Sequence, residues 1–273
     1  MRYFIYILFL SFLTLGACEN GPQNIPPPMD SGEAETDSPF FTFSFQESSP
    51  ACETSDSIRC ARVNVSMQLL KGKDNPAVES INSQVRAIAY EELSELTEVN
   101  SAEADLTKAA KTFVLEYEEM MADEEPEFIT PWSVDVESEV LYHSDLLYSI
   151  ELNNYNYTGG AHPNYYTTLR TFSLKDGTVV KLEKLIQKPA VFLQLVEQAF
   201  RAEQEIPEGQ DLAESGFFFE EAFSLPANMA FVGDGVLFIY NPYEVAPYAL
   251  GITEFVIPYA KLEGVLDLGI VGK

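Results

Sequence analysis

Few side chains in this sequence are suited to covalent chemistry. The chain has three cysteines, Cys18, Cys52 and Cys60, and two histidines, His143 and His162. A hydrolase triad or a zinc site would need such residues in a recognisable arrangement, and neither a serine elbow nor a phosphate-binding glycine loop is present. With 43 Asp and Glu residues, a neighbouring carboxylate pair does not single out a glycosidase site. We predict no catalytic residue, no cofactor and no metal ion; enzymatic activity stays undecided, with the balance against it.

Cys18 is the one cysteine whose surroundings indicate a specific reaction. Arg2 precedes an apolar run, Tyr3 to Leu15, which has the length of a signal-peptide core and is too short for a comfortable membrane span. The run ends in Leu15-Gly16-Ala17-Cys18, which resembles the lipobox of bacterial lipoproteins. We expect residues 1–17 to be removed as a signal peptide and the Cys18 thiol to carry a fatty acid such as palmitate. The alternative is an ordinary secretory signal followed by a chance cysteine.

The residues after Cys18 have the composition of a tether. Residues 19–38 are rich in Pro, Gly, Asn, Ser, Asp and Glu, so they cannot bury enough apolar surface to offset the entropy of ordering. Pro26-Pro27-Pro28 favours polyproline geometry, and at ~3.1 Å per residue the segment would reach roughly 60 Å. We therefore assign residues 18–39 to a lipidated cysteine and an acidic, proline-rich tether. Because Glu rather than Asp follows Cys18, the outer membrane is favoured if the cell is Gram-negative.

The charge of the chain restricts its partners. It carries 16 basic and 43 acidic side chains. Cleavage before Cys18 removes one charged side chain, Arg2, which leaves a formal charge of −28. Nucleic acid is excluded as a partner because phosphate binding needs a basic patch. An acidic surface instead accelerates encounters with a cationic partner, although it also serves solubility alone.

Cys52 and Cys60 form an even pair if Cys18 is acylated. Secreted proteins fold in oxidising compartments, so we expect a disulfide between Cys52 and Cys60, closing the loop of a hairpin. The localisation implied by these features is the cell envelope, with the folded body lipid-anchored and facing away from the cytosol.

The folded body shows patterns of both strand and helix. Alternating apolar residues predict strands, and apolar stripes at helical spacing predict helices. The expected strands are 41–46, 61–69, two within 132–156, 165–174, 228–232, 236–240 and 252–257. The expected helices are 76–96, opened by Asn75-Pro76, 106–120 behind Ser101, 188–204 and parts of 211–219. Short turns such as Asp176-Gly177 force antiparallel neighbours, so the predicted class is α+β with antiparallel sheets and packed helices. The order is compatible with two similar-sized parts, 40–156 and 157–268.

Two loops carry residue types that suit recognition. The first contains Tyr157, Thr158, Gly159, Gly160 and His162, and its glycines permit positive φ angles and close approach of another backbone. The second runs from Asn241 through Tyr243 to Tyr248, and its prolines would pre-set the loop before binding. Each loop is a candidate binding loop. The alternative is a structural role: a tight connection with His162 satisfied within the structure for the first loop, and a buried turn for the second.

The same two loops resemble a known family. Gly159-Gly160-Ala161-His162-Pro163 and Asn241-Pro242-Tyr243-Glu244-Val245-Ala246-Pro247-Tyr248 look like the extracytoplasmic domain of unknown function in the anti-sigma factor RsiV and in the non-catalytic part of the peptidoglycan deacetylase PdaC. The resemblance covers roughly residues 40–265. It implies an α+β fold and, by analogy with RsiV, a lysozyme-like protein ligand. Sigma-factor control and deacetylation are not implied, because the segments that carry them in those proteins have no counterpart here.

Three hypotheses of function follow from these patterns. The first is a cell-envelope lipoprotein whose ectodomain binds a lysozyme-like cationic protein or cell-wall peptidoglycan. The second is an enzyme acting on envelope polysaccharide. Two carboxyls in one pocket would support this hypothesis. The third is a purely structural lipoprotein, which would expose no aromatic cluster around Gly159 and Tyr243.

Overall fold

The computed structural model describes residues 38–54, 59–98, 105–124, 129–219 and 222–271, and its helices and strands belong to one unit, Ser38–Lys273. The expected signal peptide, Cys18 and most of the tether therefore lie outside the described residues. Within the described ranges, no helix has both the length and the apolarity that a membrane crossing requires.

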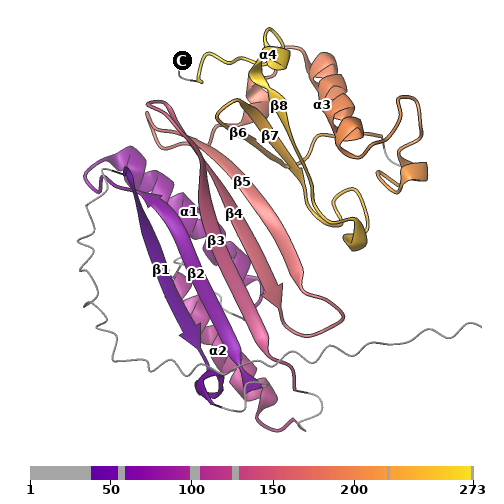
Figure 1. Cartoon of the computed structure of the whole chain (residues 1–273). Helices are drawn as coiled ribbons and strands as arrows, with labels where there is room; N and C mark the ends of the chain where they lie inside the picture. The colour runs from indigo at the N-terminus through magenta and orange to yellow at the C-terminus, as the bar shows by residue number, and fades with distance from the viewer. Residues whose placement is uncertain (1–37, 55–58, 99–104, 125–128, 220–221, 272–273) are drawn as a thin grey trace, which may run out of the picture. The chain divides into compact units, whose positions relative to one another are not determined.

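The first sheet has five strands in the order β1-β2-β3-β4-β5 (Figure 1). Their bounds are Phe40–Ser48 for β1, Ala61–Leu70 for β2, Trp132–His143 for β3, Leu147–Tyr157 for β4 and Asn164–Ser173 for β5. Neighbouring strands are antiparallel except β2 and β3, which are parallel. The α+β class is thus confirmed, but the expectation of antiparallel neighbours is wrong for this pair. The two helices between β2 and β3 return the chain to the same end of the sheet, which is the crossover that a parallel pair needs.

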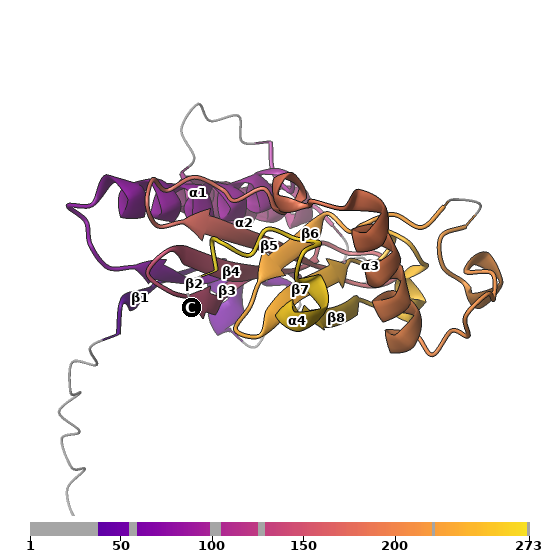
Figure 2. The same cartoon turned by 90° about the horizontal axis from the view of Figure 1, so that it is seen from above.

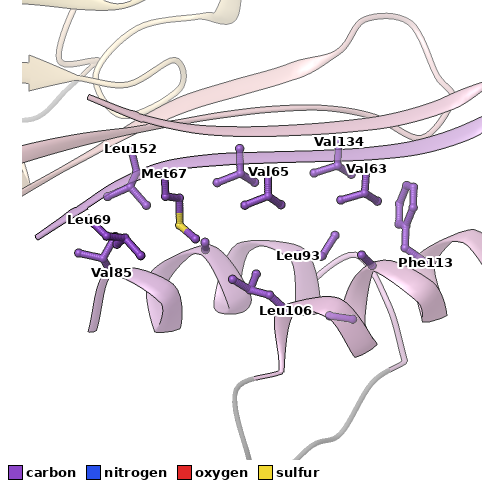
Figure 3. Close-up of a cluster of buried hydrophobic side chains, with 14 of the residues drawn as sticks. Val63, Val65, Met67, Leu69, Val85, Leu93, Leu106, Phe113, Val134 and Leu152 are labelled. Atoms are coloured by element: carbon purple, nitrogen blue, oxygen red, sulfur yellow. The ribbon is translucent and has the colours of Figure 1, made fainter. Parts of the chain in front are cut away.

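Helices α1, Pro76–Ser94, and α2, Leu106–Met121, cover one face of this sheet. Figure 3 shows alternate side chains of β2, from Val63 to Leu69, pointing into the layer between sheet and helices. From the helices, Val85, Leu93, Leu106 and Phe113 meet them there. This period-two burial is the pattern expected for a strand with one buried face.

Side-chain caps set where these helices begin. The Asn75 side chain accepts a hydrogen bond from the Ala77 amide, and Pro76 opens α1, as predicted. The Asp105 carboxylate accepts a hydrogen bond from the Lys108 amide at the start of α2. Ser101, behind which the sequence suggested this helix, lies outside the described residues.

The second sheet is antiparallel and has the strand order β6-β7-β8 (Figure 2). Its strands are β6, Asn228–Phe231, β7, Gly235–Tyr240, and β8, Thr253–Pro258, with α3, Pro189–Glu203, and the short α4, Tyr259–Leu262. Phe192, Val196 and Phe200 on α3 are buried against this sheet. The helix expected within 211–219 is only a 3-10 turn, η5, Ala213–Ser215, because Gly216 turns into the left-handed region at φ 89° and ends it. Further 3-10 turns are η1, Pro50–Glu53, η4, Leu182–Leu185, and η6, Tyr248–Leu250.

The second sheet lies against strand β5 of the first. The Leu169 amide donates to the Asn228 side chain at 3.0 Å, and the Phe231 amide donates to the Thr171 hydroxyl at 3.2 Å. Leu169 also packs in an apolar cluster with residues of β6 and β7. Tyr157, where the sequence suggested two parts to meet, is the last residue of β4.

The predicted cystine is present beside the first hairpin. A disulfide joins Cys52, in the 3-10 turn η1 after β1, to Cys60, next to the start of β2. It closes the connection between two paired strands, which is the role expected of it.

Candidate binding surface

The two loops that the sequence singled out lie side by side. The ring of His162, from the β4–β5 turn, stacks on the ring of Tyr248, from the β7–β8 connection, with centroids 3.9 Å apart and planes 18° from parallel. The Tyr243 hydroxyl lies 3.3 Å from Nε2 of His162. Residues about 80 positions apart in the chain therefore form one surface feature.

Hydrogen bonds fix the His162 ring in one orientation. The Pro163 carbonyl oxygen lies 2.8 Å from His162 Nδ1 and accepts a hydrogen bond from the Tyr248 hydroxyl at 2.7 Å. Because a carbonyl can only accept, Nδ1 must carry the proton in this contact. In the neutral ring Nε2 is then an acceptor and the Tyr243 hydroxyl is its donor. Both loops are thereby tied together through polar atoms as well as ring faces.

Asn241 holds the β7–β8 connection against the edge of the first sheet. Its side-chain oxygen accepts a hydrogen bond from the Thr167 amide at 2.8 Å, and its side-chain nitrogen donates to the Thr167 carbonyl at 2.9 Å. The amide group thus replaces one residue of a neighbouring strand at the open edge of β5. Both polar atoms of Asn241 are occupied, so its contribution to the surface is to position Tyr243.

The β4–β5 turn depends on its glycines. Gly159 and Gly160 have φ angles of 94° and 101°, which residues with a side chain rarely adopt. The Tyr157 hydroxyl donates to the Gly160 carbonyl at 3.2 Å, and Thr158 lies half-buried between them. These four residues shape the turn that presents His162.

Further tyrosines extend the ring contacts into a surface. Tyr165 packs edge-on against Tyr248 with centroids 5.3 Å apart, and Tyr155 lies opposite Tyr165 across the β4–β5 pair. Tyr243 is 64% exposed and Tyr155 is 40% exposed. We call this group of His162, Tyr155, Tyr165, Tyr243 and Tyr248 the tyrosine patch.

A hollow of about 400 Å³ adjoins the tyrosine patch. Its walls come from the end of α1, from the β4–β5 hairpin and from the β7–β8 connection. The lining residues are Glu92, Glu95, Leu96, Asn156, Asn164, Tyr165, Tyr166, Pro242, Tyr243 and Tyr248. We call it the Glu92 hollow.

The carboxylates of this hollow were not predicted as site residues. Glu92 stands in the last turn of α1, which contains no basic residue, and Glu95 is the C-cap residue of this helix. Negative charge at a helix C-terminus interacts unfavourably with the helix dipole. The acidic residues at the end of α1 were therefore a sequence signal, but the apolar spacing that predicted the helix does not reveal it.

Glu92 has an unusual protonation equilibrium. Burial, followed by repulsion from Glu95 and Glu91, raises the pKa of its carboxyl from 4.5 to about 7, although Arg170 acts in the opposite direction. At neutral pH the carboxyl is therefore divided between its protonated and charged forms.

More carboxylates border the other side of the tyrosine patch. A smaller hollow of about 170 Å³ beside Tyr155 is lined in part by Asp135 and Glu137, on the sheet face away from the helices. Nearby on β8, burial and repulsion from Glu151 and Glu203 raise the pKa of Glu254. The patch is thus a polar aromatic surface with acidic borders.

Other chemistry-bearing residues do not join this surface. His143 packs against the rings of Phe40 and Tyr148, with centroids 5.1 and 6.4 Å away. No group of three or more His, Cys, Asp and Glu side chains among the described residues is arranged to hold a metal ion.

Two family models match successive parts of the chain. Residues 55–165 match the family described as deacetylase PdaC, and residues 175–260 match DUF3298, a family of proteins of unknown function. We call these two matched stretches the PdaC region and the DUF3298 region. His162 lies in the PdaC region, whereas Tyr243 and Tyr248 lie in the DUF3298 region, so the tyrosine patch is built by both. The resemblance drawn from the two loops is confirmed.

Solved structures share the fold of the combined regions. A DUF3298 family member from Bacteroides fragilis is 24% identical with a TM-score of 0.68, covering 85% of this chain and 95% of its own. A DUF3298 family protein from Pseudomonas aeruginosa is 22% identical with a TM-score of 0.58, covering 87% of this chain and 99% of its own. No curated protein sequence matches this chain.

Proposed function

We propose that this chain is an exported lipoprotein whose folded body binds a basic, lysozyme-like protein at the tyrosine patch. One observation carries the proposal: rings from two distant loops gather on the surface, with Tyr243 exposed and locked to His162. A purely structural lipoprotein has no need of such a cluster.

The conformation of Tyr243 favours binding over packing. Its φ angle is 67°, in the left-handed region that non-glycine residues rarely occupy. Such a conformation costs roughly 1 kcal/mol or more and persists only where the surroundings impose it. Here the strained backbone presents the Tyr243 ring to solvent in a fixed position. Less conformational entropy is therefore lost when a partner covers the ring.

Charge supports a basic partner. The chain has a formal charge of −27, and carboxylates border the patch on two sides. Tyrosine supplies the apolar contact area of binding hot spots, and the surrounding field accelerates encounter with a cation.

The proposed location is the cell envelope, with the body held by an acylated Cys18 and facing away from the cytosol. The apolar leader and the Leu-Gly-Ala-Cys sequence support it, and Glu19 favours the outer membrane in a Gram-negative cell. A Cys18→Ser chain should leave the membrane fraction. Retention of that variant on membranes washed with high salt would contradict the anchor.

Binding is tested by calorimetric titration of the full chain, purified in detergent, with hen egg-white lysozyme at low and high salt. Tyr243→Ala should weaken binding about 30-fold, the loss of roughly 2 kcal/mol typical of a hot-spot ring. Leu115→Ala is the matched control, because Leu115 is 57% exposed on α2, outside the patch. Absence of binding at low salt, or equal losses in both variants, refutes the proposal. Soluble peptidoglycan fragments form a parallel arm for the glycan alternative.

Hydrolysis of an envelope polysaccharide is a second candidate, favoured by one observation. Glu92 and Glu95 line the same hollow, and a carboxyl with a pKa of about 7 beside another carboxyl resembles the acid and base pair of glycosidases. New reducing ends from soluble peptidoglycan, lost in Glu92→Gln, would establish this activity in place of simple binding.

A further inference from the structure

The Glu92 hollow has the composition of a receptor for a positively charged group. Two carboxylates, Glu92 and Glu95, stand on its α1 side. The rings of Tyr165, Tyr243 and Tyr248 contribute to its other walls. Aromatic faces attract cations through their electron-rich surfaces, and carboxylates pair with them directly.

The charges around Glu92 are unbalanced. Glu91, on α1, and Glu95, the C-cap residue of α1, repel the Glu92 carboxylate, and Arg170, on β5, attracts it. The Arg170 guanidinium also donates to the Leu169 carbonyl at 2.7 Å, so part of its hydrogen-bonding capacity is used there. Among the described residues, the partly buried Glu92 carboxyl is thus acted on by two like charges and one opposite charge.

We infer that the Glu92 hollow receives an arginine side chain of the basic partner, with the guanidinium held by the Glu92 and Glu95 carboxylates against the tyrosine rings. This inference rests on the proposed function and names the anchor of that same surface. Arginine is preferred to lysine because its planar group both stacks on rings and pairs with two carboxylate oxygens. The volume of about 400 Å³ lies within the range of small ligand pockets.

The site makes binding dependent on pH. Glu92 must be ionised to pair with the guanidinium, and its pKa in the free chain is about 7. Affinity should therefore rise with pH through the neutral range, and should fall up to about tenfold for each pH unit below 7, because one proton is released on binding. Desolvation and the neighbouring tyrosines raise the pKa of the Tyr248 hydroxyl, so this group does not ionise over the same range.

The test uses the full chain in detergent with two probes between pH 5.5 and 8.5. One is N-acetyl-arginine amide, with the uncharged citrulline compound as its control; the other is hen egg-white lysozyme. Glu92→Gln removes the charge at constant size, and Glu118→Gln is the matched control because Glu118 is exposed on α2, outside the hollow. We expect the arginine compound to bind and the citrulline compound not to bind. Glu92→Gln should weaken binding of the arginine compound about tenfold at pH 8, and Glu118→Gln should change it less than twofold.

The outcomes separate this inference from the proposed function. If lysozyme binds equally to wild type and Glu92→Gln at every pH, the arginine anchor is wrong while the binding function stands. If the arginine compound binds and lysozyme does not, the hollow is a guanidinium site and the lysozyme-like partner is wrong. If the citrulline compound binds as well as the arginine compound, the cation inference is overturned.

Discussion

Replacing Glu92 by glutamine should stabilise the protein at neutral and alkaline pH but not at acidic pH. Burial and two like charges raise the pKa of Glu92 from 4.5 to about 7 in the folded chain. Because the pKa is raised in the folded chain, the protonated Glu92 carboxyl contributes fully to folding stability below about pH 4.5. This contribution is lost as the pH rises through about 7. At pH 8 the folded wild-type chain therefore holds a carboxylate in a site that disfavours it.

The size of the effect follows from the displacement of the pKa. The rise in the pKa from 4.5 to about 7 corresponds to roughly 3.4 kcal/mol of folding free energy, at about 1.36 kcal/mol for each pH unit. Because Glu92 is only partly buried, solvent screening reduces this to roughly 1.5–2 kcal/mol. We expect Glu92→Gln to unfold with a free energy higher than wild type by that amount at pH 8, and with equal free energy at pH 4.5.

Urea unfolding followed by tryptophan fluorescence measures this difference. The chain has one tryptophan, Trp132, packed against Phe113 and Tyr117 with centroids 5.6 and 5.3 Å apart, so its emission reports the main core. Glu118→Gln, at an exposed position of α2, serves as control and should show no comparable gap between the two pH values. A gap for Glu92→Gln that is constant with pH, or a destabilisation at pH 8, would refute the account of this hollow.

Three further perturbations address the scaffold, each read by urea unfolding. Cys52→Ser with Cys60→Ser opens a connection of sequence separation 8 and should cost about 2.5 kcal/mol by the chain-entropy estimate; no change under oxidising conditions would contradict a stabilising cystine. Asn241→Ala removes both hydrogen bonds to the Thr167 backbone and should cost about 1–3 kcal/mol and weaken lysozyme binding; unaltered stability and binding would show that the loop does not need this anchor. Phe113→Ala empties a fully buried site and should cost about 3–5 kcal/mol, and a loss below 1 kcal/mol would contradict its place in the core.

The elements that carry the site were predictable because local pattern decides them. Alternation from Val63 to Leu69 predicted β2, and the Asn75-Pro76 cap predicted where α1 begins. The Gly159-Gly160 turn was predictable as a tight connection because glycine accepts positive φ. None of these required knowledge of a distant residue.

The parts that sequence reasoning missed depend on partners far along the chain. The parallel pairing of β2 with β3 follows from the two helices between them packing on a single face of the sheet. The acidic end of α1 carries no local feature that marks it as a site. It becomes a lining of the hollow only because the β4–β5 hairpin and the β7–β8 connection lie beside it.

The sequence by itself determined which segments are strands and helices, and which two loops have unusual composition, because periodicity, caps and turn chemistry act over a few neighbouring residues. Only the tertiary structure decided that His162 meets Tyr243 and Tyr248, and that Glu92 stands beside them. Those contacts join the PdaC and DUF3298 regions, and they form because β6 docks along β5 and Asn241 bonds the exposed edge of that strand. Edge pairing of this kind depends on which surfaces remain uncovered after each sheet has formed, and no local pattern records it.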